Sequence, residues 1–181
     1  MKQKILLFTV LIFIGCNSSE EKEIATLKNN TWINPYCQTS AQFDQDGNPH
    51  YTYYKSVYRF KENIISERST KYSDKNCKTS LHIYDDYNLT YYDLGLKENI
   101  DGYEIYDIKI EEKSSIVSEE KDALYAINHN QLCFSKSIYG NNVTETVSDL
   151  NGNLYTTNNS GIHIYSNRDN VIDYENCLIK K

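Results

Sequence analysis

The sequence lacks the local motifs of the common catalytic and metal-binding classes. It contains no Gly-x-Ser-x-Gly nucleophile elbow, no His-Glu-x-x-His pattern and no Cys-x-x-Cys pair. These absences argue against a serine elbow for nucleophilic catalysis, against a zinc protease, and against a zinc-ribbon or redox motif. We therefore expect a protein that is not an enzyme and holds no cofactor and no metal ion.

Positive charge and long apolar runs are also scarce. The chain has 19 Lys and Arg against 25 Asp and Glu, a formal net charge of −6. A chain of this charge is a poor candidate for binding nucleic acid. The longest apolar run covers residues 5–14, which is too short to span a bilayer core, since that takes roughly 20 residues. Glycine and proline are few, with 7 and 2 residues, whereas tyrosine is abundant, with 17.

The first residues carry the pattern of a bacterial export signal. Lys2 and Lys4 precede the apolar run, and a small residue, Gly15, stands directly before Cys16. This order is typical of a signal peptide. Residues 13–16, Phe-Ile-Gly-Cys, resemble the lipobox read by the lipoprotein signal peptidase. We interpret residues 1–15 as the signal peptide, Cys16 as the lipidated residue and residues 16–30 as a polar tether. The alternative is an ordinary secreted protein with an incidental Cys16.

Four further cysteines remain after Cys16, namely Cys37, Cys77, Cys133 and Cys177. An even number in an exported protein predicts two disulfides, for which three connectivities are possible. Four buried free thiols are the alternative. A lipid-anchored, disulfide-bonded chain belongs in the bacterial cell envelope, and we expect it at the outer membrane, facing either the periplasm or the cell surface.

Residues 31–181 predict one all-β domain. Alternation of apolar and polar residues is clearest over 52–60, where Tyr54, Tyr58 and Phe60 share a face. Further strands are expected over 64–72, 81–94, 103–111, 123–128, 132–138, 162–165 and 173–179, with turns at 61–63, 101–102, 129–131 and 151–152. Eight to ten short strands separated by turn residues favour a β-sandwich or an up-and-down barrel. The best helix candidate is the weak pattern over 142–150.

Three local patterns in this domain resemble one group of proteins. Asn30-Thr31-Trp32 stands where small lipocalin-like proteins carry Gly-x-Trp at the first strand. A strand ending Tyr58-Arg59-Phe60 follows, and then the turn Tyr72-Ser73-Asp74-Lys75-Asn76-Cys77. Together these are similar to a family of bacterial lipocalin-like lipoproteins of undefined function. They also resemble the extracellular domain of the adenomatosis-polyposis-down-regulated Wnt antagonists.

The resemblance implies an antiparallel up-and-down β-barrel. It also implies that Cys37 pairs with Cys77, which leaves Cys133 to pair with Cys177. In such a barrel Trp32 would be a buried plug at the closed end, where an arginine often packs on the indole. Arg168 is one candidate for that arginine. The resemblance covers residues 30–94 well, and the rest of the chain by its number of strands.

Several groups of residues are candidate sites. The tyrosines Tyr87, Tyr91, Tyr92, Tyr103 and Tyr106 could line a ligand cavity, although tyrosine is also a good half-buried strand residue. Residues 44–48 and 149–153 start like calcium loops but lack the glycine and the closing glutamate, so turns explain them better. The histidines His50, His82, His129 and His163 lie in separate segments. The adjacent carboxylates Asp85-Asp86 and Glu111-Glu112 would face opposite sides of their strands.

The leading functional hypothesis is a non-enzymatic binding module that is held at the membrane by the lipid on Cys16. The barrel would hold a small apolar ligand or a protein partner, and we expect it to be monomeric. The alternative is a structural or protective envelope lipoprotein, of the inhibitor or immunity type, which acts through its surface. A histidine and carboxylates that converge in one cleft would instead favour a hydrolase.

Overall fold

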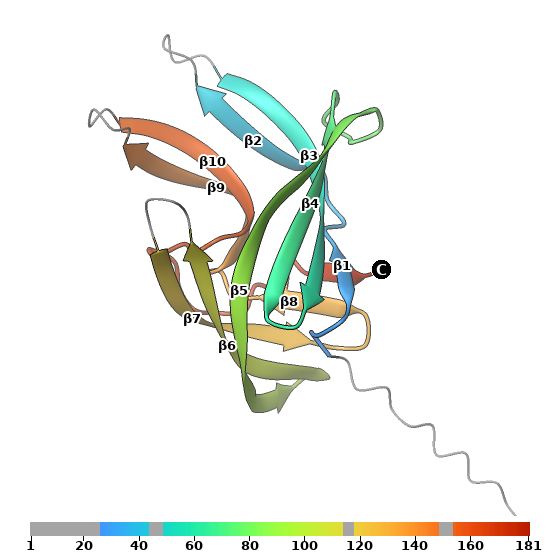
Figure 1. Ribbon diagram of the computed structural model, residues 1–181, viewed down its shortest axis with the longest axis vertical. Coiled ribbons are helices and arrows are strands. Elements are labelled where there is room, and N and C mark those ends of the chain that lie inside the picture. Colours follow the sequence, from blue (N-terminus) through green and yellow to red (C-terminus); the bar gives the residue numbers. More distant parts are fainter. Residues whose placement is uncertain (1–25, 44–48, 114–117, 149–153) are drawn as a thin grey trace, which may run out of the picture.

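Antiparallel strands form nearly all the regular structure of the computed structural model, which describes residues 26–43, 49–113, 118–148 and 154–181 (Figure 1). Among these residues no helix has the length and apolar character needed to cross a membrane. In chain order the strands are β1 Thr31–Ile33, β2 Gln38–Phe43, β3 Pro49–Lys61, β4 Ile64–Tyr72, β5 Ser80–Ile100, β6 Tyr103–Lys113, β7 Ser118–Ile127, β8 Gln131–Phe134, β9 Tyr139–Ser148, β10 Leu154–Ile162 and β11 Leu178–Lys180.

Eight of these strands close into a barrel, as the sequence predicted. Each of β3 to β7 pairs with the next strand along the chain, so the strands from β3 to β8 form an up-and-down meander. The last strand, β11, then pairs with β8 on one side and β1 on the other, and β1 pairs with β3 to complete the circle. Closure leaves the barrel strands without an open edge, and it depends on the three-residue β1.

Three strands lie outside this circle. The first half of β3 pairs with β2, and β9 and β10 form a separate hairpin that lies beside β2. One link between them is the Ser40 hydroxyl, which donates to the Asn158 carbonyl at 2.9 Å. The extra strands therefore extend the wall at one end of the barrel.

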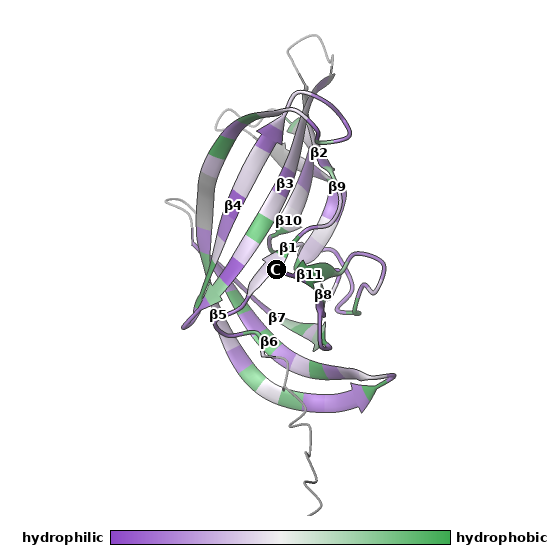
Figure 2. Cartoon of the chain, turned by 90° about the vertical axis from the view of Figure 1, so that its right-hand side faces the viewer, coloured by the Kyte–Doolittle hydropathy of each residue, from purple (hydrophilic) through white to green (hydrophobic). Residues whose placement is uncertain are grey.

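Burial alternates along the strands, as in β4, and hydrophilic and hydrophobic bands follow one another along the ribbon (Figure 2). One half of the interior is a continuous apolar core. Its largest fully buried side chains are Trp32, Tyr58, Tyr125, Tyr139, Phe60 and Phe134. Trp32 is 0% exposed, and its strand neighbours are Tyr58 on β3 and Lys180 on β11. Trp32 is therefore buried, as expected from the sequence, and it lies in the short strand that completes the circle of strands.

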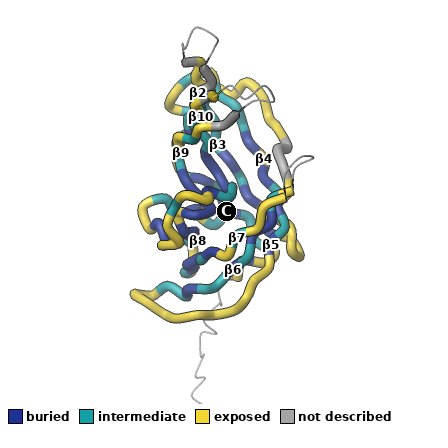
Figure 3. The backbone as a smooth tube through the Cα atoms, turned by 90° about the vertical axis from the view of Figure 1, so that its left-hand side faces the viewer, coloured by how far each residue is buried: buried dark blue, intermediate teal, exposed yellow. Residues whose placement is uncertain are grey.

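A second, smaller core lies on the outer side of the barrel wall. It contains Ile105, Ala126 and Cys133 from β6, β7 and β8, covered by Ile172 and Cys177 from the segment before β11. The Cys133–Cys177 disulfide joins the two layers of this cluster. Beyond Tyr91 the rest of β5, from Tyr92 to Ile100, is exposed (Figure 3).

The other disulfide joins Cys37, just before β2, to Cys77 in the turn between β4 and β5, so both predicted pairings are confirmed. Asp74 organises this turn, because its carboxylate accepts the backbone N–H groups of Asn76, Lys78 and Thr79 at 2.9–3.3 Å. The Thr79 N–H, helped by the other two, holds the pKa of Asp74 below its ordinary value. This local network gives a physical reason for an aspartate three residues before the cysteine.

The structure corrects some element boundaries. The weak helix prediction over 142–150 is wrong, because residues up to 148 belong to β9. The strand expected over 162–165 is also wrong: β10 ends at Ile162 and the following residues are irregular. Pairing between β9 and β10 decides both cases, since a ladder partner outweighs a weak local helix preference. The two calcium-loop candidates, 44–48 and 149–153, lie outside the described residues.

Two glycines allow a matched test of how tightly the β10 end packs. Gly161 and Gly95 have nearly the same φ, 109° and 108°, where a side chain is strained. A Cβ on Gly161 would lie 3.0 Å from the Tyr58 hydroxyl, whereas one on Gly95 meets nothing within 4 Å. We expect Gly95→Ala to cost about 1–3 kcal/mol of unfolding free energy from strain alone. Gly161→Ala should cost about 1–3 kcal/mol more from crowding.

Urea unfolding followed by far-ultraviolet circular dichroism measures both variants against the native chain. Equal losses for the two substitutions would contradict the close packing of Gly161 against β3.

Candidate functional site

A pocket of about 330 Å³ occupies the half of the barrel that the apolar core leaves unfilled. Strands β2, β3, β4 and β5 form one side of it, and the end of β10 with the residue after it forms the other. The lining side chains are mostly polar: Ser40, Thr52, Tyr54, Glu67, Ser69, Lys71, Tyr84, Asn159, Ser160 and His163. The volume lies at the lower end of the range for small-molecule sites.

Strand β4 supplies the charged part of this lining through its period of two. Every second residue of a strand faces the same side, and on β4 the inward series begins with the buried Ile65 of the apolar core. It continues with Glu67, Ser69 and Lys71, all of which line the pocket. The strand therefore changes from apolar to polar on one face, and this change marks the boundary between core and pocket.

Glu67 is the deepest charge in the pocket. It is only 7% exposed and pairs in register with Tyr58, a fully buried residue of the apolar core. The Ser69 hydroxyl donates to its carboxylate at 3.2 Å, and Ser69 in turn lies 3.1 Å from the Ser56 hydroxyl. A carboxylate is expensive to remove from water. The presence of this carboxylate next to an apolar core indicates that Glu67 has a role other than packing.

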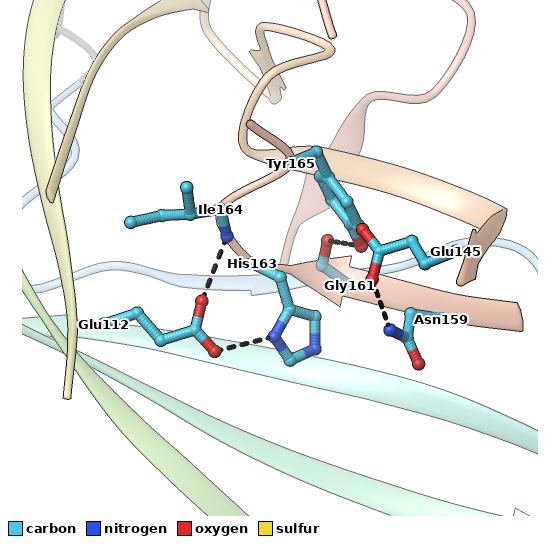
Figure 4. Close-up of polar contacts among 7 residues, drawn as sticks. All are labelled: Glu112, Glu145, Asn159, Gly161, His163, Ile164 and Tyr165. Atoms are coloured by element: carbon cyan, nitrogen blue, oxygen red, sulfur yellow. Dashed lines mark hydrogen bonds and ion pairs between the residues drawn. The ribbon is translucent and has the colours of Figure 1, made fainter. Parts of the chain in front are cut away.

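The β10 side of the pocket carries amide, hydroxyl and imidazole groups (Figure 4). The Asn159 amide donates to the Glu145 carboxylate at 2.8 Å, which links the two strands of the β9–β10 hairpin. The Ser160 hydroxyl accepts the Asn142 N–H at 2.9 Å. These bonds fix the lining residues in place, so the pocket has a defined shape without a ligand.

His163 follows directly after β10 and lies against β6 (Figure 4). Its Nδ1 is 3.1 Å from Glu112 Oε1, and Glu112 Oε2 accepts the Ile164 N–H at 3.0 Å. Burial raises the pKa of Glu112, but the His163 hydrogen bond and the Ile164 N–H outweigh it and leave that pKa below its ordinary value. When the ring is neutral and its Nδ1–H donates to Glu112, Nε2 carries the lone pair.

The tyrosines singled out in the sequence lie elsewhere. Tyr91 belongs to the apolar core, with its ring centre 5.6 Å from that of Phe60. Tyr92 is exposed, and its hydroxyl lies 3.4 Å from Glu111. Instead, Tyr54 and Tyr84 line the pocket.

Tyr103 and Tyr106 are half-buried and also lie outside the pocket. The first packs against Tyr174, and the second stacks on Tyr125 with ring centres 4.9 Å apart. Burial and a hydrogen bond to Glu104 raise the pKa of Tyr106 to about 12. The backbone of Tyr87 belongs to β5, but its side chain is outside the described part of the structure.

The remaining candidates do not assemble into a second site. Among the described residues no three His, Cys, Asp or Glu side chains are grouped to hold a metal ion. Of the four histidines, only His163 lines the pocket, although His82 packs on the pocket residue Tyr84. The guanidinium of Arg168 lies over the Tyr165 ring at 5.7 Å.

Sequence reasoning missed the polar pocket, although one signal for it was present. The series 65, 67, 69, 71 reads Ile, Glu, Ser, Lys, so one face of a single strand turns from apolar to polar halfway along. In a closed barrel the inward face has no access to bulk water except through an opening, so such a change predicts an internal polar site. The contribution of β10 and His163 had no comparable local signal.

Comparisons of the chain with models of protein families, with curated proteins and with solved structures find no match. The barrel and its pocket are therefore the basis for the function proposed below.

Proposed function

We propose that this protein is an envelope binding module that holds a small polar ligand in the barrel pocket, without catalysis. The observation that carries the proposal is the lining itself, in which the buried Glu67 and the polar groups of β4 and β10 surround about 330 Å³. From the sequence we expected a small apolar ligand or a protein partner, but this lining favours a small polar ligand. The hydroxyl, amide and charged groups of this lining can form hydrogen bonds with a polar ligand, which an apolar ligand could not return.

The packed half of the barrel supports this proposal by contrast. There the same strands β3 and β4 place Phe60 and Ile65 inward, and the interior is filled. The chain can thus fill its barrel with apolar side chains where only stability is required. The polar half is a departure from that pattern, and departures of this kind concentrate at functional sites.

A pocket-filling variant tests the proposal. Ser69→Leu places an apolar side chain in the pocket, and Thr70→Leu, whose side chain points to the opposite face of β4, is the matched control. Binding is followed by protein-detected NMR with a panel of amino acids, short peptides and mono- and disaccharides, and with palmitate as the apolar probe. We expect polar probes to shift the resonances of pocket residues, and Ser69→Leu to weaken that binding at least tenfold.

Two results would contradict the proposal. One is binding of palmitate alone, which would restore an apolar site. The other is no binding by any probe, with identical spectra for Ser69→Leu and Thr70→Leu at the pocket residues. The surface-acting alternative would then be favoured, because β5 exposes the apolar side chains Leu81, Ile83, Leu94 and Leu96.

A hydrolase is the second candidate, and one observation favours it. His163, oriented by Glu112, shares the pocket with the carboxylate of Glu67, and a histidine held by a carboxylate is the usual arrangement of a general base. Mass spectrometry of the bound probe after prolonged incubation separates the two candidates. Recovery of intact probe supports binding, and its cleavage by the native chain but not by His163→Ala supports hydrolysis.

We also propose that the barrel is anchored to the outer membrane through Cys16, on the basis of the signal and lipobox pattern in residues 1–16. Buried acyl chains contribute about 0.8 kcal/mol for each CH₂ group, so a multiply acylated cysteine holds the protein firmly. We expect Cys16→Ala to move the protein from the membrane fraction to the soluble fraction. Unchanged partitioning of the variant into detergent would contradict the anchor.

A further inference from the structure

We infer that the ligand is a short zwitterionic chain, such as a peptide of two to four residues. Its ammonium group lies at Glu67 and its carboxylate at Lys71. This inference rests on the proposed binding function and names the class of ligand. It follows from the placement of two opposite charges at two depths of one pocket, both on the inward face of β4.

The deep end of the pocket is suited to a cation. Glu67 is buried there beside the tyrosines of the core. Burial raises the pKa of Tyr139, and the negative charge of Glu67 raises it further. Carboxylates flanked by aromatic rings stabilise an ammonium group through charge and through cation–π attraction.

The other end of β4 carries the opposite charge. Lys71 lines the pocket four residues further along the strand and pairs in register with Tyr54. It is half-buried, and no described residue forms an ion pair with it. An ammonium group held at a pocket wall attracts an anionic group, and a peptide carboxylate supplies one.

The separation of the two charges sets the length of the ligand. Positions four apart on a strand are about 13 Å apart at Cα, since each residue rises about 3.3 Å. Both side chains are long and can lean toward each other, which shortens the gap that the ligand has to span. An extended peptide covers about 3.3–3.6 Å per residue, so two to four residues fit. A single amino acid carries both charges on one Cα and spans less of this gap, so alanine should bind more weakly than a tripeptide.

The wall between the two charges suits a peptide backbone. Ser40, Thr52, Ser69, Asn159 and Ser160 offer hydroxyl and amide groups that can both donate and accept hydrogen bonds. A neutral sugar could use these groups, but it has no ammonium group to interact with the Glu67 carboxylate. A diamine would satisfy Glu67 but would be repelled by Lys71.

Calorimetric titration with trialanine, N-acetyl-trialanine and trialanine amide tests the inference, with alanine and maltose as further probes. We expect trialanine to bind and each blocked form to bind at least tenfold more weakly, because a charged hydrogen bond is lost. Glu67→Gln should reduce the penalty for N-acetylation to within about twofold while the penalty for the amide remains. Lys71→Met should do the reverse. Lys61→Met, at the exposed end of β3, and Glu62→Gln, in the turn that follows, are the matched controls.

The comparison among blocked forms on the native chain does not depend on how well the variants fold. Maltose binding as tightly as trialanine, and abolished by Ser69→Leu, would overturn the zwitterion inference and leave the polar pocket in place. Equal binding of all three peptide forms would overturn it in the same way. No binding of any probe would overturn the inference and the proposed function together.

Discussion

Replacing Trp32 by alanine is expected to lower the free energy of unfolding by about 3–5 kcal/mol. The side chain is 0% exposed and belongs to the main apolar core, in the short strand through which the barrel closes. Its removal leaves a cavity where β1, β3 and β11 meet. Such a loss is a large share of the stability of an ordinary domain, typically 5–15 kcal/mol.

Urea unfolding followed by circular dichroism measures this loss, since Trp32 is the only tryptophan and its fluorescence disappears with it. Tyr36→Ala is the control, because that aromatic ring lies in the same segment but is 52% exposed, and it should cost less than about 1 kcal/mol. A Trp32→Ala variant as stable as Tyr36→Ala would contradict the assigned role. So would a native emission maximum equal to that of the unfolded chain.

Removal of the Cys133–Cys177 disulfide should have a comparable effect. The bond closes a loop with a sequence separation of 44, which corresponds to about 4 kcal/mol of unfolded-state entropy. The Cys37–Cys77 bond, with a separation of 40, has nearly the same entropic value. The first pair is buried in the outer cluster, however, while Cys37 and Cys77 are half-buried. We therefore expect Cys133→Ala/Cys177→Ala to cost more than Cys37→Ala/Cys77→Ala.

Thermal unfolding of the two double variants and of the native chain, each with and without reductant, checks this order. Reductant should destabilise the native chain by breaking both disulfides. It should destabilise each double variant only by breaking the one disulfide that remains. A larger loss for Cys37→Ala/Cys77→Ala would contradict the role of the outer cluster. It would place the greater contribution in the turn held by Asp74.

The barrel itself was largely predictable because its signals are local. Alternation over 52–60 and 64–72 reappears in β3 and β4, and the turn at Asp101-Gly102 joins β5 to β6 with both residues at positive φ. Trp32 and the two disulfide pairings came from the resemblance to lipocalin-like lipoproteins, and the structure confirms both pairings. By contrast, β2 and β9 were missed, since their stability comes from partner strands and not from their own composition.

The tyrosines illustrate why a face is harder to predict than a strand. Along β5 the pairing register shifts against β4 near Ser66 and against β6 near Asp93 and Leu96. Each extra residue exchanges the inward and outward faces of the strand. The strand can be predicted from the sequence, but the number of register shifts within it cannot. Such shifts decide that Tyr84 lines the pocket while Tyr91 lies in the core.

The sequence by itself determined the strand period, the turns and the inward polar series of β4, because each depends on residues within a few positions of one another. The pattern in residues 1–16 that we interpret as an export signal is local in the same way. Only the tertiary structure decided the site. Glu112 and His163 are 51 residues apart, and Ser40 and Asn158 are 118 apart, yet both pairs are in hydrogen-bond contact. Barrel closure and the packing of the β9–β10 hairpin bring them together, and no local preference encodes where a hairpin docks.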